Sequence, residues 1–162
     1  MVRKIDPAGY VARCREIIER HTIRELSALG EECVKRIRDR SPEDSWIDHT
    51  GNLRSSIGYM VLCDGKEVSA NGFLPTESPE GNGSKGQQEG RRYMEEIARD
   101  VAGSSGFSLV IVAGMNYADK VEALDNKDVL ASTKIWAANR WPGIERKLKA
   151  KIEKEINKLE IF

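Results

Sequence analysis

The feature that most constrains the fold is an alternating apolar run, about 57–63, that ends directly at Asp64-Gly65. Asp and Gly tolerate the positive φ angles of a type I′ turn, so this dipeptide between two β-type runs predicts a tight hairpin. Both faces of the first strand carry apolar side chains, so we expect a covering layer on each. The returning strand, about 67–73, is more polar and is expected at a sheet edge.

Long amphipathic helices are expected near both ends of the chain. From about Ala8 to Arg40, apolar residues recur at steps of three and four, which is the spacing of one helix face. The members of this stripe are Val11, Cys14, Ile18, Leu26, Leu29, Cys33 and Ile37. Pro42 disfavours helical backbone at Ser41 and should end the helix there. A second stripe runs from about Ser132 through Ile144, Leu148, Ile152, Ile156 and Leu159, and Pro142 within it predicts a kink or a new helix start.

The middle of the chain alternates loop and short elements. Segment 74–90 is rich in Gly and Pro, which predicts a loop that is mobile in the free protein and becomes ordered on assembly. A short helix is expected at about 87–102, and 107–113 is the clearest core strand because it is β-branched and uncharged. Segment 117–122 is predicted as a short strand or helical turn, and 128–130 as a final strand.

This order of elements predicts one α+β domain over residues 1–162, with a small, mostly antiparallel sheet packed against the long N-terminal and C-terminal helices. The chain has 26 basic and 26 acidic side chains, a balance that argues against a general nucleic-acid or membrane binder. No apolar run approaches the roughly 20 residues that a spanning helix needs. The N-terminal residues lack the apolar core of a signal peptide. Three cysteines without CxxC spacing favour buried thiols in a reducing cytoplasm.

No familiar catalytic or ligand-binding motif is present in the sequence. Asp44, Asp48 and His49 form the only local group of metal-ligating side chains, and we favour a loop that caps a following turn over a metal site. The basic residues Arg36, Arg38 and Arg40 could touch phosphate, but they more commonly complement the negative end of a helix dipole. We therefore expect no catalysis, no cofactor and no metal. An enzyme site assembled around Asp48 and His49 from distant residues is the weaker alternative.

Two phrases of the sequence resemble a known family. Thr50-Gly51-Asn52-Leu53-Arg54-Ser55-Ser56 is similar to the TGxLRxS phrase of the lambdoid-phage gene-product-ten-like family of minor tail, or head–tail joining, proteins. Tyr117-Ala118-Asp119-Lys120-Val121-Glu122 resembles that family's second phrase, which also follows an apolar strand. The Gly-Thr pair that often follows the glutamate in that family is absent here, and the loop at 64–90 looks like an insertion.

The resemblance implies a structural component of a tailed phage or prophage particle that joins or completes the head–tail junction. It implies a virion protein that is synthesised in the host cytoplasm. Its partners would be other copies of itself, as a ring with head-to-tail contacts, and neighbouring neck or tail proteins, with no membrane and no specific nucleic acid. The alternative is a small cytoplasmic binding module outside any virion, including a nucleic-acid-binding one.

The family-motif residues have mechanical interpretations of their own. Thr50 and Gly51 would form a tight turn, since Gly permits backbone that is costly for other residues. Leu53 would anchor the strand entrance in the core and leave Arg54 pointing outward. Tyr117 would pack on one side and donate a hydrogen bond on the other, and Glu122 would pair with a basic residue, for example on a neighbouring subunit. The alternative is that all of these residues, Ala118 included, only hold the turn and the sheet.

Overall fold

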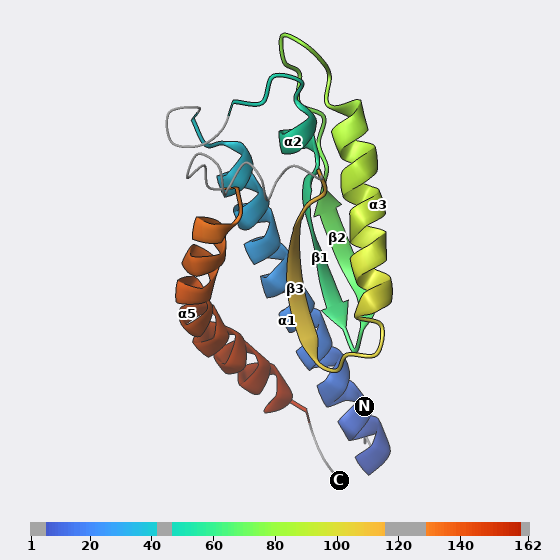
Figure 1. Cartoon of the computed structure of the whole chain (residues 1–162). Coiled ribbons are helices and arrows are strands. Elements are labelled where there is room, and N and C mark those ends of the chain that lie inside the picture. Colours follow the sequence, from blue (N-terminus) through green and yellow to red (C-terminus); the bar gives the residue numbers. More distant parts are fainter. Residues whose placement is uncertain (1–5, 42–46, 116–128, 160–162) are drawn as a thin grey trace.

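The computed structural model describes residues 6–41, 47–115 and 129–159. Its elements follow one another along the chain as α1 (Pro7–Arg38), α2 (Asn52–Ser55), β1 (Ile57–Cys63), β2 (Lys66–Gly72), α3 (Ser84–Asp100), β3 (Phe107–Ala113) and α5 (Ala131–Ile156). The three strands form one antiparallel sheet in the order β2-β1-β3, and the long helices α1 and α5 lie beside it (Figure 1). The α+β architecture with a small antiparallel sheet is therefore confirmed.

The predicted hairpin joins β1 to β2. Asp64 and Gly65 have φ angles of 49° and 74°, which is the backbone of the type I′ turn expected from their types. The pairing of the two strands starts beside the turn at Cys63↔Lys66 and shifts by one residue between Leu62 and Val61 of β1. Such a bulge bends the strand and increases its twist. The more polar β2 lies at an edge of the sheet, as predicted.

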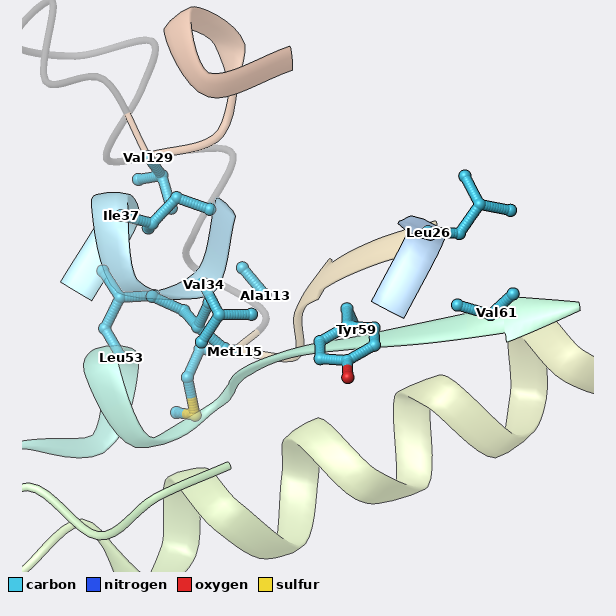
Figure 2. Packing of buried hydrophobic residues seen from close by; sticks show 10 residues of the cluster. Leu26, Val34, Ile37, Leu53, Tyr59, Val61, Ala113, Met115 and Val129 are labelled. Carbon is cyan, nitrogen blue, oxygen red and sulfur yellow. The ribbon is translucent and has the colours of Figure 1, made fainter. Parts of the chain in front are cut away.

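Helices cover both faces of β1. Odd-numbered strand residues such as Tyr59 and Val61 pack against α1, and Figure 2 shows this cluster with Leu53 and Ile37 at one end. Even-numbered residues such as Met60 pack against α3 on the other face, around Met94 and Phe73. Alternation of side chains across a strand thus gives the sheet two apolar faces, and the expectation of two covering layers is confirmed.

Strand β3 occupies an edge, which corrects the prediction of a core strand. The central strand is β1, which pairs with β2 on one side and with β3 on the other. Only Val112 and Ala113 of β3 are buried, and the residues before them are partly exposed. A β-branched, uncharged run fits a strand covered on both faces, but it does not reveal whether a further strand pairs beside it.

The apolar stripe predicted on α1 is right in its second half and wrong in its first. Leu26, Leu29, Cys33 and Ile37 are buried, whereas Val11 is 66% exposed and Ile18 is 38% exposed. The first turns of α1 extend beyond the end of the sheet (Figure 1), and from the strands only the ends at Cys63 and Phe107 border the open hollow that this part of the stripe lines. Asp6 caps this end by accepting a hydrogen bond from the Gly9 N–H at 2.5 Å.

Other boundaries differ from the predictions. Helix α3 begins at Ser84, so the last seven residues of the predicted 74–90 loop are helical. Val129 and Leu130 form a bend that leads into α5, and the strand predicted there is not formed. Helix α5 continues through Pro142 and changes direction along its length (Figure 1), which confirms a bend and excludes a new start. The 117–122 segment and Asp128 lie outside the described residues.

Candidate interaction surface

The Thr50–Ser56 motif is an internal junction of the fold. Gly51 has a φ of 72°, and a Cβ atom at this position would collide with the carbonyl oxygen of Thr76. Glycine is required here for both reasons, because L side chains rarely adopt this φ and no space exists for one. Leu53 is 1% exposed and lies in the core. The roles predicted for Gly51 and Leu53 are confirmed.

Arg54 does not point outward as predicted. Its guanidinium donates to the carbonyl oxygens of Arg38 and, at 3.0 Å, of Arg40, so it satisfies carbonyls at the C-terminal end of α1. Its own backbone N–H donates to the Asp48 carboxylate at 2.8 Å. Asp48 therefore caps the short helix α2, as the sequence suggested. The prediction about Arg54 was wrong because the acceptors lie in a helix end that is distant in the sequence.

The same junction fastens the loop that precedes α3. The Thr76 N–H donates to the Ser55 hydroxyl at 2.8 Å, and the Gly83 N–H donates to the Thr50 carbonyl at 3.3 Å. The Thr50 hydroxyl accepts a hydrogen bond from the Asn52 N–H at 3.3 Å. The polar groups of the motif are thus engaged within the chain. This favours the alternative in which these residues hold the turn and the sheet.

The structure brings no ligand-binding cluster together in the part of the chain that it describes. Within residues 6–41, 47–115 and 129–159, no group of three or more His, Cys, Asp or Glu side chains could hold a metal ion. His49 is exposed and lies 3.8 Å from Glu80, while Asp44 lies outside the described residues. The family-motif residues Tyr117, Ala118 and Glu122 also lie outside them. None of the described helices is both long and apolar enough to cross a bilayer.

The basic residues at the end of α1 contact groups of the same chain. The Arg36 guanidinium lies 5.0 Å from the centre of the Trp136 ring. Arg38 donates to the Thr76 hydroxyl at 2.8 Å, and burial lowers the pKa of its guanidinium. Arg40 donates to the hydroxyls of Ser132 and Thr133 on α5. These side chains tie α1 to its neighbours.

The outer edge of β3 is open among the described residues. The Gly114 N–H donates to the Ser56 carbonyl, and the Asp64 N–H donates to the Gly106 carbonyl. The backbone N–H and carbonyl groups of even-numbered residues in and beside β3 therefore point toward β1. Hydrogen-bonded pairs alternate along an antiparallel ladder. The backbone groups of Phe107, Leu109 and Ile111 therefore point away from β1. No described strand pairs with them.

An apolar trough lies between β3 and α5 and is lined on a third side by Ile18, Thr22, Cys33 and Ile37 of α1. One cavity of about 330 Å³ is lined by Leu109 and Ile111 on the β3 side and by Thr133, Lys134 and Ala137 on α5. A second, of about 530 Å³, continues past Phe107 and is lined on α5 by residues that include Trp141, Leu148, Ile152 and Glu153. We call these two cavities with the open edge the β3–α5 trough. It combines unpaired backbone groups with apolar side chains, which are the elements of strand addition.

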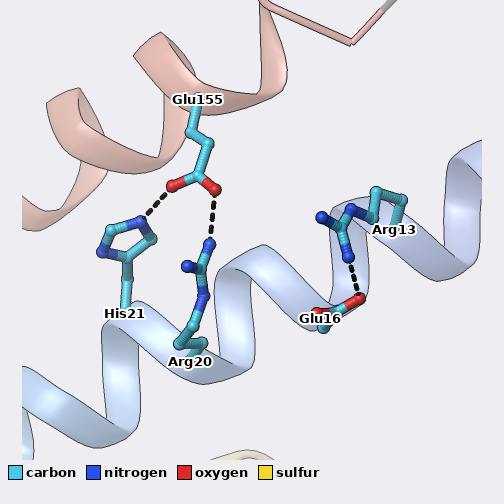
Figure 3. A network of polar contacts seen from close by, with 5 residues as sticks. All are labelled: Arg13, Glu16, Arg20, His21 and Glu155. Carbon is cyan, nitrogen blue, oxygen red and sulfur yellow. Dashed lines mark hydrogen bonds and ion pairs between the residues drawn. The ribbon is translucent and has the colours of Figure 1, made fainter.

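Polar contacts hold α5 to α1 on the far side of this trough. Glu155 of α5 accepts hydrogen bonds from His21, at 2.6 Å, and from Arg20 (Figure 3). These hydrogen bonds lower the pKa of the Glu155 carboxyl below its ordinary value. Lys151 also pairs with Glu25 at 2.5 Å. Helix α5 is therefore anchored to α1 and stands beside the edge of β3.

Sequence reasoning missed this trough as a surface. The uncharged run at 107–113 was the available signal, because an edge strand without charge is unusual in a soluble protein. The apolar stripe on α5 was detected, and its predicted packing against the sheet is confirmed at Leu130 and Trp141, but the hollows that remain beside β3 were not expected. Comparisons with protein-family models, curated proteins and solved structures found no match to this chain.

Proposed function

We propose that this chain is a structural component of a tailed phage or prophage particle and acts at the head–tail junction through subunit contacts. In this proposal the β3–α5 trough is the surface that receives the neighbouring subunit. The chain contributes shape and backbone hydrogen bonds, with no catalysis.

The main support for a subunit-contact role is that the outer edge of β3 lacks the features that usually prevent a sheet edge from pairing with another chain. Natural sheet edges are usually blunted by charges, bulges or proline, because an open edge pairs with other chains. Strand β3 has none of these over Phe107–Ala113, and its pairing with β1 is regular along its whole length. By contrast, β2 begins with the charged pair Lys66 and Glu67 and pairs with β1 across a bulge.

The placement in a phage particle is supported by the resemblance of the two sequence phrases. The first phrase forms a junction that joins α1, α2 and the loop before α3, and it therefore secures the sheet from which β3 projects. A rigid support of this kind suits a subunit that must present one edge in a fixed orientation.

The proposal is tested by deleting the gene from its prophage and counting joined particles by electron microscopy after induction. We expect separate heads and tails, and rescue by the wild-type gene. A Leu109→Lys variant places a charge in the trough and should fail to rescue. The matched control is Val68→Lys on β2, where the side chain is 43% exposed, and this variant should rescue.

Joined particles at the wild-type level without the gene would contradict the proposal, and so would flanking genes that encode no portal, capsid or tail-tube protein. A salt-dependent DNA shift by the purified chain would instead favour the alternative of a nucleic-acid-binding module. No contact of the described residues favours that alternative, because Arg36, Arg38 and Arg40 are engaged within the chain.

A further inference from the structure

The charges that line the β3–α5 trough are arranged by sign along its length. Lys134 lies at the end of the trough near Ile111, and Glu153 lies at the opposite end, beyond Phe107. Neither side chain forms an ion pair with another described residue. Between them, Glu145 and Lys149 pair with each other at 2.9 Å and leave no net charge.

The trough therefore has a positive end, a middle without net charge and a negative end. Its middle offers the outward backbone groups of Phe107, Leu109 and Ile111, whose side chains pack on the same face of the sheet. A strand that pairs with β3 would place every second side chain on this face, against α5. Those side chains would meet Trp141 and Leu148, so apolar residues fit at these positions.

The helix sets the length of the segment that fits. Lys134 and Glu153 are 19 positions apart on α5, which corresponds to ~28 Å along a straight helix. An extended strand advances about 3.4 Å per residue, so roughly eight or nine residues would span the two charges. Because α5 bends, the two charges lie closer together than on a straight helix, so nine residues are enough to span them.

We propose that the trough binds an extended segment of another polypeptide, antiparallel to β3, with an acidic residue first, alternating apolar residues next and a basic residue last. Because β3 runs toward the Lys134 end, the antiparallel partner begins there, where its acidic residue meets Lys134. Its basic residue then meets Glu153. This inference names the partner chemistry of the proposed subunit contact and rests on the same surface.

A second copy of the same chain fits this surface less well. Helix α5 lies beside the open side of β3 (Figure 1), so an approaching sheet would bring a second α5 into the same space. The β3 sequence, FSLVIVA, also carries no charge to match Lys134 or Glu153. A single extended strand brings no second helix and can carry a charge at each end.

The test uses the purified full chain and a fluorescent nine-residue peptide with Asp first, Val at alternate inner positions, Thr between them and Lys last. Its control is a peptide of identical composition with Asp and Lys exchanged. We expect the first peptide to bind about tenfold more tightly by fluorescence anisotropy, as two reversed surface ion pairs allow. The double variant Lys134→Glu, Glu153→Lys should bind the exchanged peptide more tightly, while its circular dichroism stays that of the wild type.

Equal affinity for the two peptides, no binding of either, or a preference that the double variant leaves unchanged would overturn the inference. Self-association of the wild-type chain that Leu109→Lys abolishes and that the peptide does not compete with would also overturn it, in favour of a second copy. These outcomes are separate from particle assembly. If Leu109→Lys blocks joining but the peptides do not discriminate, the proposed function stands and this inference fails. If the peptides discriminate but Leu109→Lys does not block joining, the inference stands and the trough has no part in particle joining.

Discussion

Helices α3 and α5 both lie along the sheet, but they approach it in different ways. Helix α3 packs with its glycines against the backbone of the other elements, and a Cβ atom on Gly90 would lie 2.6 Å from the Ser56 carbonyl oxygen. A Cβ on Gly86 would collide with the Asn52 carbonyl. The backbones are so close that no partner could enter between them.

Helix α5 instead packs on the sheet through Leu130 and Trp141, leaves hollows beside β3, and is held to α1 by polar contacts. Its contacts with α1 include three ion pairs that involve Arg140, Lys151 and Glu155. The space between α5 and β3 includes the cavities of about 330 and 530 Å³. Only Thr133 and Leu148 of this helix are buried. The comparison teaches that one side of the sheet is closed by close packing, whereas on the other side no described strand pairs with the outer edge of β3.

The largest expected effect is on the closely packed side. Gly90→Ala should lower the free energy of unfolding by ~3 kcal/mol, because the added methyl group meets backbone at Ser56 and the Phe73 ring, neither of which can move freely. The matched control is Gly143→Ala on α5, where no atom outside the adjacent backbone of the helix lies within 4 Å of the new Cβ. This variant should stabilise the protein by up to ~1 kcal/mol through helix propensity. Urea unfolding measures both, and equal losses would show that the two helices are packed alike.

A pair of core truncations gives a smaller difference between the two sides of the sheet. Met94 on α3 and Leu148 on α5 are each 5% exposed, so their substitution by Ala compares the two sides at equal burial. We expect Met94→Ala to cost about 3 kcal/mol and Leu148→Ala about 2 kcal/mol, because Leu148 already borders a cavity and loses fewer contacts.

The reactivity of the Cys33 thiol distinguishes the same two variants, Met94→Ala and Leu148→Ala. This thiol lines the trough, is fully buried, and burial raises its pKa to about 11. Only about one thiol in a thousand is then ionised at pH 8. Leu148→Ala should speed alkylation of Cys33 by loosening α5, and Met94→Ala should not. Mass spectrometry of the alkylated chain measures the rates, and faster labelling in both variants alike would argue that α5 does not open independently of the sheet.

The smallest expected effect is a loss of hydrogen-exchange protection in α5 at acidic pH. The pKa of Glu155 is held below its ordinary value of 4.5 by hydrogen bonds from His21 and Arg20. A carboxyl whose pKa is lower in the folded state stabilises that state above its ordinary pKa, and the contribution is lost as the pH falls through the lowered value. We therefore expect protection of the α5 amides from hydrogen exchange, corrected for intrinsic rates, to decrease below pH 4.5 while that of α3 changes less.

Glu155→Gln provides the control for this acid effect. The amide cannot ionise, so the variant should show low α5 protection at neutral pH and little further loss on acidification. If wild type and variant lose protection in parallel as the pH falls, then Glu155 does not anchor α5.

Local sequence patterns predicted the helices and strands, but they did not predict the contacts between distant parts of the chain. The Asp64-Gly65 turn was predicted because turn geometry depends on the types of two adjacent residues. The start of α3 at Ser84 was missed because a Gly-rich composition suggests a loop, whereas here Gly86 and Gly90 allow the helix to approach the backbone of α2 and β1. The trough was missed for a related reason, since it forms between 107–113 and α5, which no local pattern relates to each other.

By itself, the sequence determined the hairpin, the two long helices and the need to cover both faces of β1, because periodicity and turn chemistry act over a few neighbouring residues. Only the tertiary structure decided that β3 lies at an edge, that Arg54 caps the end of α1 and that hollows remain between α5 and β3. Each of these depends on which distant backbone groups find hydrogen-bond partners and on how closely two surfaces can approach. Those quantities are set by the packing of the whole chain.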